Sequence, residues 1–194
     1  MLTLVTSLAR LMALIGGLVL TGLVVLTCAS VIGRGLNTLG HSEWMTATLP
    51  GLGEALIASG VGPITGDFEL VEAGIAFAIF AFLPVAQLYG AHATVDIFTS
   101  RMPGPAQRTL VAFWEIALAG AIILITCRLW FGMTDKMRYG ETTFLLQFPI
   151  WWAYAASFAG ALAASIVAVY CAFARVIGVR TGHAPLPGEV GADH

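Results

Sequence analysis

Long stretches without charged side chains dominate this chain of 194 residues. A helix needs about 20 mostly apolar residues to cross the hydrocarbon core of a bilayer. The fourth uncharged run, residues 142–174, exceeds one span, and Pro149 suits the first turn of a helix, so we start the last span there. The predicted spans cover residues 11–33, 73–95, 109–131 and 149–174. The fold class that follows is an all-α integral membrane protein with four transmembrane helices.

The composition supports the same conclusion. Only 10% of the residues are charged, whereas soluble domains carry about 25% charged residues to cover their surface. The net charge of −2 provides no basic surface for nucleic acid, so a nucleic-acid partner is excluded along with an ordinary soluble enzyme. Membrane lipid is the partner that this composition requires.

The first span has one competing interpretation, a cleaved signal peptide. Its apolar run is longer than the roughly 7–15 residues of a signal core, and no A-x-A cleavage site follows it. We therefore predict one four-helix transmembrane domain over residues 1–178, followed by a disordered tail over residues 179–194 that contains two prolines and two acids.

The distribution of Lys and Arg over the short loops predicts the orientation, because cytoplasmic loops carry the excess of positive charge. With both termini in the cytoplasm, the inner side holds five Lys or Arg residues and the outer side three, or four if Arg128 is included. Both termini are thus expected to be cytoplasmic. The long first connection, residues 34–67, would then be periplasmic. Its apolar residues recur at roughly helical spacing among Gly and Pro, which predicts either a short interfacial helix or a plain loop.

The cysteines and histidines do not form the patterns that redox or haem chemistry requires. The three cysteines fall within the predicted spans and form no C-x-x-C pair, as a thiol–disulfide oxidoreductase would need. Of the four histidines only His92 lies beside a span, so the chain lacks two facing haem ligands. We expect no catalytic residues, no metal and no cofactor.

Ionisable residues inside a membrane are costly and often mark functional positions. Glu115 is the clear example, and it is expected to snorkel to the interface, to bond to a neighbouring helix or to contact a partner subunit. Two acids lie at the N-terminal end of the second span, where negative charge interacts favourably with the helix dipole. A group of polar residues lies at its C-terminal end. The candidate contact residues or helix-end anchors, together with two tryptophans suited to an interfacial aromatic belt, are Glu69, Glu72, Gln87, His92, Asp96, Glu115, Trp151 and Trp152.

Small residues on membrane helices allow close backbone approach and therefore lateral packing. The candidates for such contacts are Gly16, Gly17, Gly22, Gly74, Gly120 and Gly160.

Two groups of motifs carry a family resemblance. The first is G-D-F-E-L-V-E over residues 66–72 and the helix exit with Pro84, Gln87, Gly90, His92, Val95 and Asp96; the second is Gly140 to Thr143 and Pro149 to Tyr154. In order and spacing they resemble the DctQ-type small membrane subunit of tripartite ATP-independent periplasmic (TRAP) transporters. The resemblance covers about residues 65–175. It departs from the family pattern at Ala91, which separates Gly90 from His92.

The resemblance implies a function that composition does not provide. A DctQ-type subunit pairs with a large multispan permease in the bacterial inner membrane, and a periplasmic solute-binding protein delivers an organic acid for sodium-driven uptake. The small subunit would be a non-catalytic scaffold. Two alternatives from other classes are a membrane anchor of a redox complex and an autonomous homo-oligomeric channel or carrier.

Overall fold

The computed structural model of the chain describes residues 2–91, 103–181 and 186. Within these residues the structure is helical, with no β-strand. Four of the helices are long and apolar enough to cross a membrane, which confirms the predicted fold class. The helices are α1 (Leu2–Gly40), α2 (Glu43–Thr48), α3 (Pro50–Ala58), α4 (Asp67–Leu88), α5 (Gly104–Tyr139) and α6 (Trp151–Thr181).

The helices do not coincide with the predicted spans. Residues 11–33, 109–131 and 149–174 lie inside longer helices, except that α6 begins two residues after Pro149. Charged residues end an apolar run, but Arg and Lys are good helix formers, so the backbone helix continues beyond the hydrocarbon. Helix α1 has 39 residues and is about 58 Å long, against about 30 Å of hydrocarbon.

The predicted span 73–95 differs from helix α4 at both ends. Helix α4 begins earlier, at Asp67. The acids of its first turn stabilise the helix N-terminus and do not interrupt the helix. It ends earlier, at Leu88, and the chain then passes through Gly90 in the left-handed conformation with φ of 62°. Pro84 lies inside α4.

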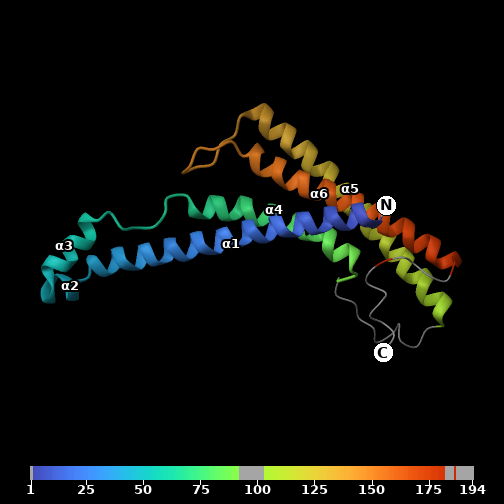
Figure 1. The fold of residues 1–194 in the computed structure, drawn as a ribbon. Coiled ribbons are helices and arrows are strands. Elements are labelled where there is room, and N and C mark those ends of the chain that lie inside the picture. Colours follow the sequence, from blue (N-terminus) through green and yellow to red (C-terminus); the bar gives the residue numbers. More distant parts are fainter. Residues whose placement is uncertain (1, 92–102, 182–185, 187–194) are drawn as a thin grey trace.

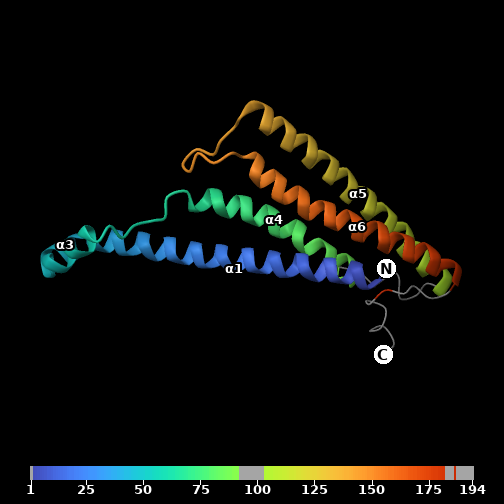
Figure 2. The same cartoon turned by 45° about the horizontal axis from the view of Figure 1, so that its top comes forward.

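The four long helices form a single row rather than a closed bundle. Helix α4 packs between α1 and α6, and α6 packs between α4 and α5, so the order across the layer is α1, α4, α6, α5 (Figures 1 and 2). In the most apolar 18-residue stretch of α1 only 11% of the residues are buried, compared with 39% in α6. Most of the apolar surface of α1 therefore has no partner within the described part of the chain.

Small residues make the close contacts within the row. A side-chain carbon at Gly16 would lie 2.9 Å from the Cβ of Ala81, and one at Gly160 would lie 3.0 Å from the Cβ of Phe80. Gly74 is similarly covered by Leu23. In contrast, no described atom lies within 4 Å of such a carbon at Gly17, Gly22 or Gly120. Half of the predicted packing glycines are thus used within the chain, and the other half face open space.

The helices converge at the end of the row that holds the N-terminus. There, Ala9 of α1, Leu88 of α4, and Val167 and Cys171 of α6 form a buried apolar cluster. Leu186 is buried in the same cluster. Helix α6 extends three residues past Gly178, where we expected the tail to begin, and the rest of that tail lies outside the described residues.

The connection over residues 34–67 contains more structure than one interfacial helix. Helix α1 continues to Gly40, and the short helices α2 and α3 fold back along it (Figure 1). We call residues 34–66 the arm. A side-chain carbon at Gly33 would collide with the carbonyl oxygen of Gly62, and the Asn37 amide donates to the carbonyl oxygen of Val61 at 3.0 Å. These contacts fix the returning chain against α1.

We predict that Gly160→Leu destabilises the chain, because the new side chain would meet the backbone of α4 at Phe80 and Ala81. Overpacking of this kind costs about 1–3 kcal/mol. The measurement is thermal unfolding of the purified chain in detergent. Gly120→Leu is the matched control, since it adds the same side chain on α5 where no described atom is near. Equal melting temperatures for the two variants would contradict the tight contact between α4 and α6.

Candidate functional site

Three clusters of polar contacts lie at the ends of the row and join its elements. Two lie at the end that carries the arm and the α5–α6 connection, which we call the loop end, and one lies at the opposite end, which we call the terminal end. Unpaired polar groups are costly in hydrocarbon. In each cluster, polar side chains find partners within the chain.

The α5–α6 connection, residues 140–150, is a structured hairpin. Helix α5 ends at Gly140, whose φ of 62° permits the left-handed turn. The Thr143 amide donates to the Phe148 carbonyl at 2.9 Å, and the Ile150 amide donates to the Glu141 carbonyl at 3.0 Å. Lys136 pairs with Glu141 at 2.5 Å and closes the base of the hairpin.

Glu69 binds the tip of this hairpin. Its side chain is buried, with 5% of the residue exposed. One carboxylate oxygen accepts from the Leu145 amide at 2.6 Å and the other from the Leu146 amide at 2.9 Å. Charge-assisted hydrogen bonds of this kind are about twice as strong as neutral ones. Glu69 lies in the first turn of α4, and it connects α4 to the hairpin within the chain.

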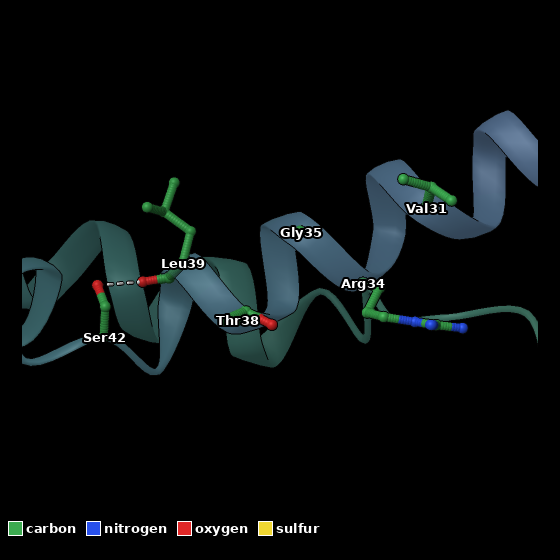
Figure 3. A pocket seen from close by; sticks show the side chains of 6 residues that line it. All are labelled: Val31, Arg34, Gly35, Thr38, Leu39 and Ser42. Carbon is green, nitrogen blue, oxygen red and sulfur yellow. Dashed lines mark hydrogen bonds between the residues drawn. The ribbon is translucent and has the colours of Figure 1, made fainter.

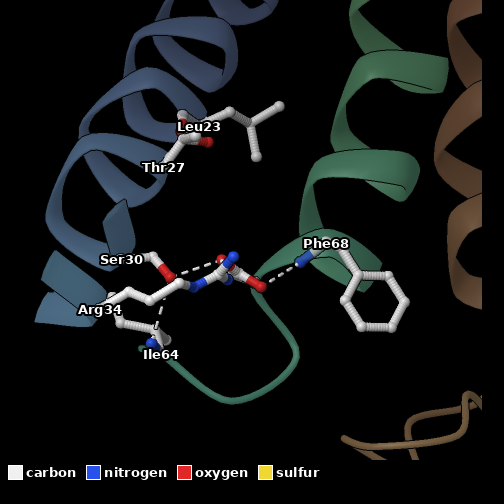
Figure 4. Close-up of polar contacts among 7 residues, drawn as sticks. Leu23, Thr27, Ser30, Arg34, Ile64 and Phe68 are labelled. Atoms are coloured by element: carbon white, nitrogen blue, oxygen red, sulfur yellow. Dashed lines mark hydrogen bonds and ion pairs between the residues drawn. The ribbon is translucent and has the colours of Figure 1, made fainter. Parts of the chain in front are cut away.

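Asp67 makes the second contact at the loop end. The Ser30 hydroxyl donates to the Asp67 carboxylate at 2.5 Å and accepts from the Ile64 amide at 3.2 Å (Figure 4). The Arg34 guanidinium lies 3.9 Å from the same carboxylate. Ser30 is fully buried, so this cluster fixes the start of α4 to α1. The sequence reasoning did not select Ser30 or Asp67, although an acid directly after the Thr-Gly turn is a recognisable helix start.

Glu115 lies in the third cluster, at the terminal end. The Gln87 amide of α4 donates to one Glu115 oxygen, and the Arg175 guanidinium of α6 lies 3.9 Å from the other. The side chains of Arg175 and Glu115 are only 16% and 12% exposed. Of the expectations for Glu115, the structure shows the bond to a neighbouring helix. It brings together Gln87 and Glu115 from our candidates and adds Arg175, which was not among them.

The remaining candidates lie apart from these clusters. Glu72 is exposed on α4, and Trp151 and Trp152 lie at the start of α6 with their rings 6.1 Å apart, edge to face. Trp152 is 56% exposed. His92 and Asp96 lie outside the described residues. The structure therefore does not gather the eight candidates into one site.

Two hollows occur on the described surface. One, of about 470 Å³, lies along α1 in the arm, where Arg34 is its one charged lining residue and the Ser42 hydroxyl donates to the Leu39 carbonyl (Figure 3). The other, of about 540 Å³, is a crevice between α4 and α6 beneath the hairpin. Glu69, Glu72 and Tyr154 line it together with apolar side chains. Among the described residues no group of three or more His, Cys, Asp or Glu could hold a metal ion.

The comparisons with known proteins identify a family. The family model described as "Tripartite ATP-independent periplasmic transporters, DctQ component" matches residues 23–178, which is more than half of the chain. The match begins within α1 and includes the arm, the hairpin and all three polar clusters. No curated protein and no solved structure matched the chain.

We predict that Glu69→Ala releases the hairpin from α4. The amides of Leu145 and Leu146 would lose their carboxylate acceptors and exchange with solvent faster. Hydrogen exchange followed by mass spectrometry on the peptide over residues 141–150 measures this change. Glu72→Ala is the control, because Glu72 is exposed three residues further along the same helix and makes no such bonds. Unchanged exchange in Glu69→Ala would show that the carboxylate does not hold the hairpin.

A second prediction concerns Glu115→Ala. The change removes the carboxylate that accepts from the Gln87 amide and lies 3.9 Å from the Arg175 guanidinium, and a hydrogen bond to a charged group contributes about 1.5–3 kcal/mol. The melting temperature of the purified chain should fall, and Glu115→Gln should fall less because it keeps an oxygen that can accept from Gln87. A variant that melts like wild type but loses its partner subunit would instead place Glu115 at a subunit interface.

Proposed function

Because the chain belongs to the DctQ family of tripartite ATP-independent periplasmic transporters, and is thus a small permease subunit in the inner membrane, we propose that it scaffolds the large permease subunit. In this proposal the chain carries no solute. It holds the large subunit in the bilayer while that subunit moves an organic acid, a carboxylate, driven by a sodium gradient. A periplasmic binding protein delivers the acid.

The observation that carries the proposal is the flat arrangement of the helices. A row one helix thick cannot bury its own apolar residues, and α1 at its edge is the least buried of the four spans. In lipid, helices associate through close packing of small residues. Gly22 lies on α1, exposed, with no described atom near its Cβ position. We propose that this edge of α1 packs against the large permease.

The two ends of the row would face opposite sides of the membrane and would therefore meet different partners. An even number of spans puts both chain ends on one side of the membrane, and the arm and hairpin on the other. We propose that the arm and hairpin face the periplasm, where the binding protein approaches. Arg34 is the one Lys or Arg of the arm, so the arm lacks the basic face that binds anionic lipid surfaces. It does expose Trp44 and Leu52, which are 63% and 54% accessible.

The polar clusters support a scaffold rather than a pathway. Autonomous transporters place polar groups and broken helices near the middle of the membrane. Here Glu115 is paired with Gln87 and Arg175, and Glu69 is bonded to the hairpin, so these carboxylates already have partners within the chain. We therefore assign the solute and sodium sites to the large subunit.

The test is reconstitution of uptake in liposomes. We expect sodium-driven uptake of an organic acid only when this chain, the large permease and the binding protein are all present, because each supplies a separate function. Gly22→Leu should lower co-purification of the chain with a tagged large permease by about tenfold, as expected if a close helix contact worth about 1.4 kcal/mol is lost.

Gly120→Leu on α5 is the matched control for that variant, since its position is equally open but lies at the other edge of the row. Loss of the complex with Gly120→Leu alone would move the interface to α5. Uptake by this chain alone would overturn the scaffold and favour an autonomous carrier. A haem Soret band in the purified chain would favour the redox anchor.

A further inference from the structure

The crevice between α4 and α6 ends at a close helix contact on one side and at the hairpin on the other. Both helices run from the loop end to the terminal end, and they meet where Gly160 approaches Phe80 and Ala81. Beyond this contact they diverge toward the hairpin (Figure 2). Leu129 of α5 also lines the crevice, and the hairpin covers its top. From Phe68 to Phe80 it extends over 12 residues of α4, about 18 Å.

The charged residues of the lining lie near the hairpin. Glu69 and Glu72 are in the first two turns of α4, whereas the deeper lining is uncharged and includes Ala76, Phe80, Leu129 and Ser157. A phospholipid likewise carries its charges in the headgroup, above an uncharged chain. The length of the crevice along α4 also suits an acyl chain, because one leaflet of hydrocarbon is about 15 Å thick, half of the bilayer core.

The charge of the lining discriminates between headgroups. Both charged residues that line the crevice are carboxylates, and no Lys or Arg lines it. The two oxygens of Glu69 are occupied by the amides of Leu145 and Leu146. Glu72 is exposed at the level of the polar lining, and among the described residues it has no hydrogen bond or ion pair. A cationic group is therefore favoured beside Glu72, and an anionic headgroup is disfavoured.

We propose that this crevice is a binding site for a phospholipid that carries a primary amine. Its acyl chain lies against Ala76, Phe80 and Leu129, and its ammonium group lies beside the Glu72 carboxylate. The bound lipid fills the space that the diverging helices leave and supports α6 against α4 at the loop end. The site is separate from the edge of α1 assigned to the large permease, so it does not depend on that assignment.

The experiment uses the full chain in nanodiscs made with equal amounts of phosphatidylethanolamine and phosphatidylglycerol. Native mass spectrometry counts the lipids that stay bound after release from the disc. We expect phosphatidylethanolamine to be retained over phosphatidylglycerol by about threefold, the preference that one partly exposed charge pair supplies. Glu72→Gln should remove this preference. Glu54→Gln, which neutralises an exposed carboxylate on α3, should leave it unchanged.

A second pair of variants tests the chain-binding part. Ala76→Phe places a ring in the crevice and should lower the number of retained lipids by one per chain. Ala117→Phe is the control, because Ala117 is exposed on α5 away from the crevice. Equal retention of the two lipids by wild type, or an unchanged preference in Glu72→Gln, overturns the proposal. Loss of the large permease from Ala76→Phe with no loss of lipid also overturns it, since the crevice would then hold a segment of that subunit.

Discussion

The need to pair buried polar groups determines how this chain packs. Away from water, a side-chain amide or carboxylate needs a partner within the protein, and here Gln87, Glu115 and Arg175 form one cluster. They come from α4, α5 and α6, and their contact fixes the relative positions of these three helices at the terminal end. A pair of buried hydroxyls repeats the principle halfway along the row, where Thr126 and Ser165 lie 2.8 Å apart between α5 and α6. The apolar clusters fill the space between these polar contacts.

The same constraint explains why the chain remains a single layer. Polar contacts and small residues join neighbours in the order α1, α4, α6, α5, and within the described residues no polar contact joins α1 to α5, so the row does not close on itself. A closed bundle would hide the apolar face of each helix, whereas a row leaves two broad faces and two edges exposed. In water this surface would aggregate, but in lipid it is stable and available to a partner. The family membership therefore agrees with the architecture, since a component of a tripartite system needs such a surface.

The sequence predicted the four spans of the row. Some contacts between the helices were also predictable from it, although we did not predict them. Uncharged runs are sufficient to place four spans, because hydrocarbon tolerates few charges. Glu115 and Arg175 each lie thirty positions from residue 145, the middle of the turn between two antiparallel helices. Their proximity could therefore be predicted by counting residues from the turn.

The bond from Glu69 to the hairpin could not be predicted in this way, because it joins a helix end to two backbone amides 76 and 77 residues away. Side-chain patterns do not reveal which backbone amides are left without partners. The helical spacing in the arm predicted a short helix or a loop, but it did not predict that the arm folds back on α1, which depends on close contacts at Gly33 and Gly40.

The two ends of the row are stabilised by different kinds of contact. At the terminal end three helices share one buried polar cluster and an apolar core, so moving one helix would disturb the other two. At the loop end no described polar contact joins α4 directly to α6: Asp67 at the start of α4 bonds to Ser30 on α1, and Glu69 accepts from the hairpin amides. Helices α4 and α6 can therefore separate at the loop end while their terminal halves stay packed, and the crevice occupies that separation. Whatever fills the crevice must supply the lateral contact that the chain itself lacks there. A lipid chain is suited to this, because it is present on all sides of the row and can enter without displacing a paired polar group.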